Sequence, residues 1–450
     1  MEMYREWILG DAHPPGFFLF YFAWFKIAPN TEFWARIPNA IAGVMTVMYL
    51  LVRTERILTR DERIMSATLA SLSYIYIFYA LSVKQYSGMI LFSTVATISY
   101  LEIVTAQRVD RRTGITLAAA CLVLAYLNHF AMVYAWLLIA LLALTFRHNR
   151  EVLRRIMRIG IALGLGYLPI AYFLYLQVKY SIDAWQPYEI DSFLSDVLPS
   201  LFFDDSTYVK WGLGTLVGWL LVVAVTRPHS RRMLGASRNR HIVLIVMAGA
   251  GFLLALGMAK PIFFVRYFLV IVPALFLGLG ILMSAVFPIE RGWLAILPLV
   301  FFFHAAVVQF RSIDGMQRQQ WDKSVDFVLA SKKSDEPIFV LGAKMDKTEF
   351  DYLRKGDVDG VFYVRNLKFY EYYFRRRRVF DIAAKLEVVE PTVSSVMELA
   401  ARFRGTETTI YVLAGHHIQY RGEALATLEQ VTRQMEVTPM CSTLIYRLTF

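Results

Sequence analysis

Eleven apolar stretches of helical length constrain the fold of this chain more than any other feature. They lie at roughly 16–28, 36–52, 64–80, 87–105, 115–127, 130–146, 157–177, 211–226, 242–258, 267–287 and 293–310. With 57% hydrophobic residues, 18% charged residues and a mean hydropathy of +0.46, the composition differs strongly from that of a soluble domain. We therefore predict a polytopic α-helical membrane protein.

The basic residues alternate between the connecting loops and predict the orientation of the helices. One set of loops holds the arginines of 53–63, 108–112, 147–158 and 227–240, together with Arg291. The other set holds only Lys84, Lys179, Lys210, Lys260 and Arg266. Because short cytoplasmic loops of membrane proteins carry the excess of lysine and arginine, the first set is predicted to be cytoplasmic and the second to face outward.

The orientation of stretch 36–52 decides how stretch 16–28 is interpreted. Stretch 36–52 leads into a cytoplasmic loop, so it starts outside, and stretch 16–28 then cannot cross without moving the N-terminal residues to the cytoplasm. We expect 16–28 to be an interfacial helix in the outer leaflet. About ten spans remain, starting and ending outside, which suggests a further span upstream of this sequence.

After residue 310 the composition becomes charged, and we predict a boundary between a transmembrane domain, 1–310, and a soluble domain, 311–450. Short β-rich runs at 338–341, 361–364, 409–413 and 443–446 alternate with helical patterns such as Ala424 to Met435. The second domain is therefore predicted to be a small extracytoplasmic α/β domain.

The segment Gly10-Asp11-Ala12-His13-Pro14-Pro15 precedes the first apolar stretch. Two adjacent prolines cannot lie inside a helix, so the helix is expected to start at or after Pro15. Asp11 and His13 would then lie at the membrane interface, where ionisable groups are costly and commonly functional. The alternative is a solvated start of a helix.

The other unusual polar residues of the membrane half fall in loops that are predicted to face outward. They are Lys84 and Tyr86, His129 at a helical hairpin tip, Asp204 and Asp205 in loop 178–210, and Arg266 with Tyr267. Cations neutralise a leaving phosphate, and a carboxylate accepts the proton of an attacking hydroxyl, so the set suits transfer from a phosphate-linked lipid donor. Snorkelling of Arg266 and capping of helix ends by Lys84 and His129 are the alternatives.

The sequence gives no diagnostic metal pattern. Asp11, His13 and the loop acids could bind a divalent metal, but their spacing matches no known ligand motif. Cys121 and Cys441 are the two cysteines, which leaves neither a disulfide framework nor a CxxC site. The net charge of +11 is interpreted as a topology signal and a hint of anionic lipid or phosphate partners, with no nucleic acid implied.

Several of these motifs, in this order, resemble those of the GT-C membrane glycosyltransferases, in the branch of the protein O-mannosyltransferases and aminoarabinose transferases. Asp11-Ala12-His13-Pro14-Pro15 resembles the D-x-H-P-P element of that family, and Arg36-Ile37-Pro38 with Gly43 resembles its R-x-P…G element. Lys84-Gln85-Tyr86 stands in the place of the E-A-R-x-Y element. Asn128-His129-Phe130 resembles the T-H-Y tip, and Val265-Arg266-Tyr267 resembles the R-Y element.

The resemblance implies a polyprenyl-phosphate sugar donor, inversion at the anomeric carbon and an outer C-terminal domain that begins near Trp321. It also has two departures. Family members carry a first transmembrane helix and an acidic residue, usually taken as the catalytic base, upstream of D-x-H-P-P, and this sequence begins after that point. Lys84 and Gln85 also replace the E-A-R pattern.

Together these features predict an inverting glycosyltransferase of the bacterial cytoplasmic membrane, acting at the outer face on a glycan, lipid or protein acceptor. Asp11, aided by His13, would be the catalytic carboxylate. Arg266, Tyr267, Lys84 and Tyr86 would bind the donor phosphate, and His129, Asp204 and Asp205 would complete the site. The alternative is a non-catalytic protein that binds or translocates polyprenyl phosphate. A transporter is disfavoured, because the ionisable groups form no relay across the bilayer.

Overall fold

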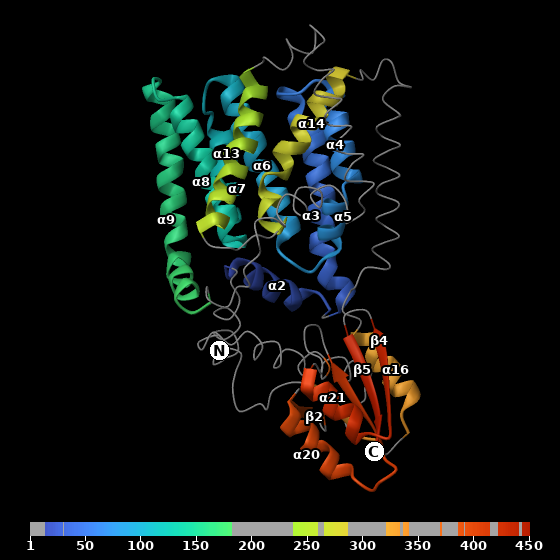
Figure 1. Ribbon diagram of the computed structural model, residues 1–450. Coiled ribbons are helices and arrows are strands. Elements are labelled where there is room, and N and C mark those ends of the chain that lie inside the picture. The colour runs from blue at the N-terminus through green and yellow to red at the C-terminus, as the bar shows by residue number, and fades with distance from the viewer. Residues whose placement is uncertain are drawn as a thin grey trace. The chain divides into compact units, whose positions relative to one another are not determined.

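The computed structural model describes residues 14–29, 31–181, 237–259, 265–286, 321–333, 336–341, 370, 386–390, 392–414, 422–440 and 443–450. The chain divides into two compact units. The helical unit contains the described helices from α2 to α14, and the sheet unit contains the described elements from α16 to β5 (Figure 1). The boundary predicted after residue 310 lies outside the described residues.

The helical unit is built from helices that follow the apolar stretches of the sequence. Its described elements are α2 (Gly16–Ile27), α3 (Glu32–Arg53), η1 (Thr54–Arg56), α4 (Arg60–Leu72), α5 (Tyr74–Leu81), α6 (Tyr86–Ala106), α7 (Arg111–Leu127), α8 (His129–Thr145), α9 (Arg150–Ser181), α13 (Ser237–Ala259), η4 (Val265–Val270) and α14 (Val272–Val286). The predicted stretches 211–226 and 293–310 lie outside the described residues, so the count of ten spans stays a prediction.

Two stretches that were predicted as continuous are interrupted. Stretch 64–80 breaks at Ser73, whose extended backbone, with φ −71° and ψ 126°, ends α4 and starts α5. Stretch 267–287 begins as the 3-10 helix η4 before α14. Apolar composition is the same on both sides of each break, so hydropathy alone does not reveal it.

Helix α2 lies across the ends of the neighbouring helices instead of running along them (Figure 1). It has 12 residues, and its apolar side chains Leu19, Phe20 and Phe22 are exposed. A helix of this length cannot cross a bilayer, which requires about 20 residues. The length and direction of α2 are those of a helix in the plane of a membrane surface.

Two of the described helices are long and apolar enough to cross a membrane, namely α3 continued through η1, at Phe33–Arg56, and α6. They differ in their surroundings. The apolar window of α3 is 22% buried, whereas that of α6 is 78% buried, so α6 is central in the helical unit and α3 is peripheral. The shorter apolar helices include α2, α8 and the span of α14.

One end of the helical unit is held by ion pairs that involve the arginines used above as orientation signals. Arg238 at the start of α13 donates 2.8 Å to the fully buried carboxylate of Glu62 on α4. Arg53 at the end of α3 lies 3.4 Å from Glu102 near the end of α6. Several of these arginines therefore stabilise contacts between helices in addition to marking an orientation. We call this the arginine-rich end.

The sheet unit contains one mixed five-stranded sheet in the order β2-β1-β3-β5-β4. Its described elements are α16 (Trp321–Ser331), β1 (Ile338–Leu341), β2 (Glu387–Val389), α20 (Val393–Phe403), β3 (Thr409–Ala414), α21 (Gly422–Val431), β4 (Gln434–Met440) and β5 (Thr443–Thr449). Strand β1 pairs in parallel with β2 and β3, and β5 pairs antiparallel with β3 and β4. Alternate residues of β3 contribute to two apolar clusters, so both faces are covered.

Three of the predicted strands are found as β1, β3 and β5, whereas 361–364 lies outside the described residues. The helix predicted to reach Met435 is wrong at its end. Helix α21 ends at Val431, and Gln434 and Met435 begin the edge strand β4, paired with Thr449 and Leu448. Residues 434–438 have no clear helical stop signal before them, and the pairing with β5 decides their conformation.

Candidate functional site

The other end of the helical unit, where α2 lies, is joined by buried hydrogen bonds. The hydroxyl of Tyr21 on α2 donates 2.7 Å to the carbonyl oxygen of Ala35. The side-chain amide of Asn39 on α3 donates 2.6 Å to the carbonyl oxygen of Ser82, which follows α5, and 3.0 Å to the hydroxyl of Tyr21. These bonds connect α2, the start of α3 and the turn between α5 and α6. We call this the α2 end.

The prolines of the opening motif lead directly into this end. Pro14 and Pro15 are buried, and a Cβ atom on the next residue, Gly16, would lie 2.3 Å from the carbonyl oxygen of Tyr126. The start of α2 therefore touches the last turn of α7, two residues before Asn128. Asp11 and His13, the predicted catalytic residues, lie outside the described residues.

The tip between α7 and α8 is a single residue, Asn128, whose side-chain oxygen accepts 2.8 Å from the backbone N–H of Phe130. This N-cap starts α8 at His129. The imidazole Nδ1 of His129 lies 3.3 Å from the hydroxyl of Tyr167 on α9. The predicted polar hairpin tip is thus present, and Tyr167 is a partner that the sequence did not indicate.

Phe130 also connects the tip to the R-Y element. Its ring stacks on that of Tyr267 at a centroid distance of 3.9 Å and an interplanar angle of 23°. Tyr267 is 6% exposed and belongs to η4, which packs against α6, α8 and α14. The backbone of Arg266 precedes it in η4, but its side chain lies outside the described residues. Two elements 137 positions apart, 130 and 267, are therefore adjacent.

The start of α6 provides the third part of the α2 end. Lys84 is exposed, and Tyr86 is buried with its ring 4.8 Å from that of Tyr79. Gln85 and Ser87 are each 2% exposed, and Gln85 Nε2 and Ser87 Oγ have no hydrogen-bond partner among the described residues. Burying such groups without a partner is costly, so Gln85 and Ser87 can donate to a polar group that the described residues do not supply.

The electrostatics at the start of α6 favour an anion. Gln85, the N-cap residue, makes no capping hydrogen bond with its side chain, and the N–H groups of the first turn carry the positive end of the helix dipole. The Gln85 amide and the Ser87 hydroxyl can donate, and Lys84 adds a full positive charge. Phosphate or carboxylate oxygens are the acceptors that fit such a group of donors.

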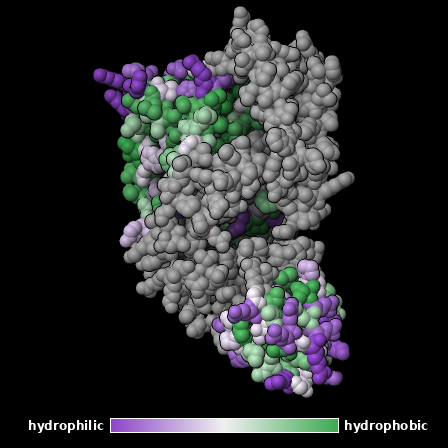
Figure 2. Space-filling view, in the orientation of Figure 1, coloured by the Kyte–Doolittle hydropathy of each residue, from purple (hydrophilic) through white to green (hydrophobic). Residues whose placement is uncertain are grey.

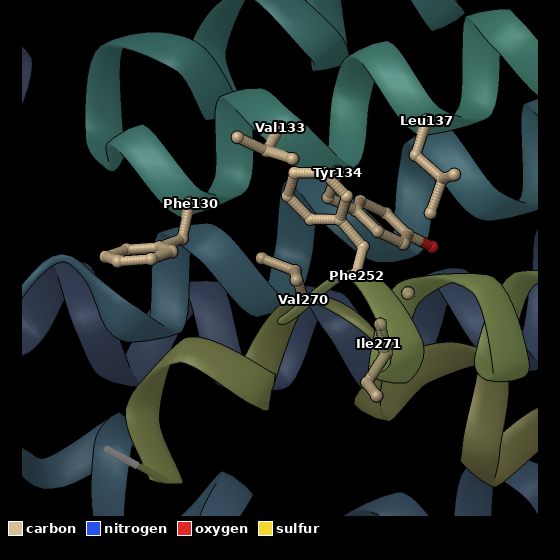
Figure 3. A pocket seen from close by; sticks show the side chains of 8 residues that line it. Phe130, Val133, Tyr134, Leu137, Phe252, Val270 and Ile271 are labelled. Carbon is tan, nitrogen blue, oxygen red and sulfur yellow. The ribbon is translucent and has the colours of Figure 1, made fainter. Parts of the chain in front are cut away.

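A small apolar cavity of about 10 Å³ lies between α8, α13 and the chain around η4 (Figure 3). Phe130, Val133, Tyr134 and Leu137 line it from α8, and Phe252, Val270 and Ile271 face them. Phe130 is shared between this cavity and the stack with Tyr267, so the cavity adjoins the α2 end. Its lining offers few polar groups, and its volume corresponds to about a single water molecule.

The remaining predicted residues are not placed. Asp204 and Asp205 lie outside the described residues. Among the residues that the structure does describe, no group of three or more His, Cys, Asp or Glu side chains could hold a metal ion. The residues that were predicted as possible metal ligands, Asp11, His13 and the acids of loop 178–210, lie outside the described residues.

The sequence did not indicate the buried donors Gln85 and Ser87 as a pair, nor Tyr167. Their burial depends on neighbouring helices that cover the start of α6. For example, a Cβ atom on Gly88 would lie 3.1 Å from the side chain of Leu127 on α7. The role of Asn128 could have been recognised, since Asn directly before an apolar helical stretch is an N-cap signal.

The fold and this arrangement define a helical bundle with a surface helix, followed by an α/β unit. Comparison with solved structures finds this fold in ArnT from Cupriavidus metallidurans, both bound to undecaprenyl phosphate and in the apo state. Each matches with a TM-score of 0.53 and 10% sequence identity over 97% of this chain, covering 88% and 87% of the ArnT chain. No protein-family profile and no curated protein matches the sequence. The similarity therefore concerns the GT-C fold.

Proposed function

We propose that this chain is a membrane glycosyltransferase of the GT-C class, which moves a sugar from a polyprenyl-phosphate carrier to a glycan, lipid or protein acceptor. We place the reaction at the outer face of the bacterial cytoplasmic membrane, with the sheet unit outside. The fold similarity to ArnT, one structure of which is bound to undecaprenyl phosphate, supports the class of donor. The alternating arginines support the orientation.

One observation carries the proposal, namely the start of α6. Exposed Lys84, the uncapped first turn of the helix and the buried donors of Gln85 and Ser87 form an anion site at the α2 end. A lipid phosphate would supply the acceptors that these groups lack among the described residues.

In the proposed reaction the acceptor hydroxyl attacks the anomeric carbon while the bond from that carbon to the phosphate oxygen breaks. The Asp11 carboxylate takes the hydroxyl proton, aided by His13, and polyprenyl phosphate leaves. Lys84 and Arg266 neutralise the developing phosphate charge. Tyr86 and Tyr267 would complete the donor-phosphate site, and His129, Asp204 and Asp205 would face the sugar or acceptor. A single displacement inverts the anomeric carbon.

The test measures release of polyprenyl phosphate from a polyprenyl-phosphate sugar by the full chain in membranes. Asp11→Asn should lower the rate at least about 100-fold, because general-base catalysis typically contributes that much. Arg266→Ala should lower it by a similar amount. Glu55→Gln and Arg60→Ala are matched controls at the arginine-rich end and should leave the rate unchanged. Unchanged rates in the Asp11 and Arg266 variants would contradict these assignments.

The same experiment addresses the alternative of a non-catalytic lipid-binding or lipid-translocating protein. Saturable binding of polyprenyl phosphate that depends on Lys84, without any sugar transfer to extracts of envelope acceptors, would favour that alternative. Sugar transfer by the chain starting at Met1 would exclude it.

A further inference from the structure

A second charged surface lies at the arginine-rich end, where α7 and α9 begin. It contains seven exposed arginines that have no part in the proposed reaction, which we call the α7–α9 arginine cluster: Arg108, Arg111, Arg112, Arg147, Arg150, Arg154 and Arg158. They come from the turn before α7, the turn before α9 and the first turns of both helices.

Contacts between α9 and the chain around the start of α7 bring these segments together. The guanidinium of Arg155 on α9 donates 2.7 Å to the carbonyl oxygen of Val109, in the turn before α7. A Cβ atom on Gly114 of α7 would lie 3.2 Å from Val109 and 3.6 Å from Ile159 of α9. Arg155 and Ile159, in the second and third turns of α9, therefore lie next to the turn before α7 and its first turn, so the arginines of the two segments are close together.

The carboxylates of this surface are engaged in local contacts. Asp110 accepts 2.9 Å from the backbone N–H of Thr113 and 2.8 Å from its hydroxyl, as the N-cap of α7. These bonds hold the pKa of the Asp110 carboxyl below its usual value. Glu151 accepts 2.7 Å from Arg155. Two acids thus face eight arginines, and the surface keeps a large positive excess.

An exposed apolar strip continues directly from the cluster. On α9, residues at spacings of three or four share one face, with Ile161 59%, Leu165 63%, Leu168 62% and Tyr172 64% exposed. Ile115 on α7, one turn after Arg111, is 58% exposed. At about 1.5 Å per residue the strip from Arg158 to Tyr172 is about 21 Å long. Figure 2 shows hydrophilic side chains gathered at this end with hydrophobic surface directly below them.

We propose that the α7–α9 arginine cluster binds the headgroup of an anionic phospholipid, whose acyl chains lie along the exposed strip of α9. The proposal rests on the membrane location proposed above, but not on the transfer reaction. Guanidinium groups bind phosphate oxygens as a planar fork of donors, and interfacial arginines attract anionic lipids strongly. The positive excess argues for an anionic headgroup over a zwitterionic one.

This site is separate from the proposed donor site at the start of α6. Helix α7 has 17 residues between Arg111 and Leu127, which corresponds to about 25 Å. Leu127 lies beside Gly88 at the start of α6, so the two sites lie at opposite ends of the helical unit. Loss of one kind of lipid binding should therefore leave the other intact.

The experiment purifies the full chain from membranes of phosphatidylglycerol and phosphatidylethanolamine and measures the retained lipids by native mass spectrometry. The wild-type chain should retain phosphatidylglycerol selectively. In the variant Arg111→Gln/Arg154→Gln/Arg158→Gln the affinity should fall on the order of a hundredfold, since each interfacial arginine accounts for about fivefold. The control Arg56→Gln/Arg60→Gln/Arg240→Gln removes the same charge from exposed positions on η1, α4 and α13, and should retain the lipid.

Equal retention of the two lipids by the wild-type chain would overturn the proposal, and so would equal losses in the two triple variants, which would indicate general surface charge. If the first variant fails to insert into the membrane, the variant Arg111→Lys/Arg154→Lys/Arg158→Lys can replace it. This variant keeps the positive charge that sets the orientation of the helices but removes the planar guanidinium groups. Its affinity should fall several-fold, and an unchanged affinity would contradict headgroup recognition by these arginines. Binding of polyprenyl phosphate, measured in parallel, should be unchanged in all variants.

Discussion

Gly16 at the start of α2 touches the carbonyl oxygen of Tyr126 near the end of α7, since a Cβ atom on Gly16 would lie only 2.3 Å away. The contact fixes where the opening motif meets the α7–α8 tip. Tyr126 is two residues before Asn128, so the contact places Gly16 close to the tip residues Asn128 and His129. Gly16, the residue directly after the segment Asp11–Pro15, therefore lies close to the segment Asn128-His129-Phe130, although the two segments are far apart in sequence.

Replacing Gly16 by Ala should displace α2 from α7, because a carbonyl oxygen of the backbone cannot move aside as a flexible side chain can. We expect the free energy of unfolding to fall by about 1–3 kcal/mol, the usual cost of overpacking. The buried thiol of Cys121 can report unfolding of the helical unit through its reaction with a fluorescent maleimide in a Cys441→Ser background. Gly251→Ala is the control, since nothing lies within 4 Å of its Cβ position. A wild-type transition in Gly16→Ala would refute the contact.

Ser87→Ala should have opposite effects on stability and on ligand binding. Removing a buried hydroxyl that lacks a partner among the described residues should leave the free energy of unfolding unchanged or raise it by up to about 1 kcal/mol. The affinity for polyprenyl phosphate should fall about tenfold, measured by titration of the full chain in detergent. The matched control is Ser66→Ala on α4, whose buried hydroxyl also lacks such a partner. It should change stability similarly and binding not at all.

The buried pair of Glu62 and Arg238 should be essential for holding the start of α13 to α4. Glu62 is 0% exposed and Arg238 16%, so Arg238→Met leaves a buried carboxylate without its cation and should cost about 3–5 kcal/mol. Adding Glu62→Gln to Arg238→Met should restore much of the loss. The exposed pair of Arg155 and Glu151 is the contrast, and breaking it with Glu151→Gln should cost under about 0.5 kcal/mol. Comparable losses for the two pairs, seen in the Cys121 assay, would contradict this expectation.

In the sheet unit, Arg402 on α20 donates two hydrogen bonds, of 2.5 and 3.0 Å, to Glu387 on β2. These bonds hold the pKa of the Glu387 carboxyl below its usual value of about 4.3. Because the folded-state pKa is lowered, the stabilisation is present above pH of about 4.3 and is lost as the pH falls through the folded-state value. Both side chains are about half exposed, so the effect should stay under about 1 kcal/mol.

The measurement is hydrogen exchange of peptides from β2 and α20 in the full chain between pH 3 and pH 6, with rates corrected for intrinsic pH dependence. Protection should decline at the acidic end in the wild-type chain. Glu387→Gln should remove that decline, whereas Glu398→Gln, another acid of α20, should keep it. An identical decline in Glu387→Gln would assign it to other groups.

Local patterns in the sequence were sufficient for most elements of the helical unit. Hydropathy and the length of the apolar stretches located α3, α6, α7, α8, α9 and α13, because each of these helices follows one continuous apolar stretch. The break at Ser73 and the end of α21 at Val431 were not predicted. In both cases neighbouring residues favour more than one conformation, and the partners that decide between them are distant in sequence.

The sequence by itself determined the kinds of chemistry available, since Lys84, His129, Arg266 and the opening motif are visible as unusual polar residues beside apolar stretches. Only the tertiary structure decided which of them meet, through contacts such as Phe130 on Tyr267 and Gly16 on Tyr126. It also turned Gln85 and Ser87 into buried donors and paired Glu62 with Arg238. The physical reason is that burial and desolvation are properties of packed neighbours, which can come from anywhere along the chain.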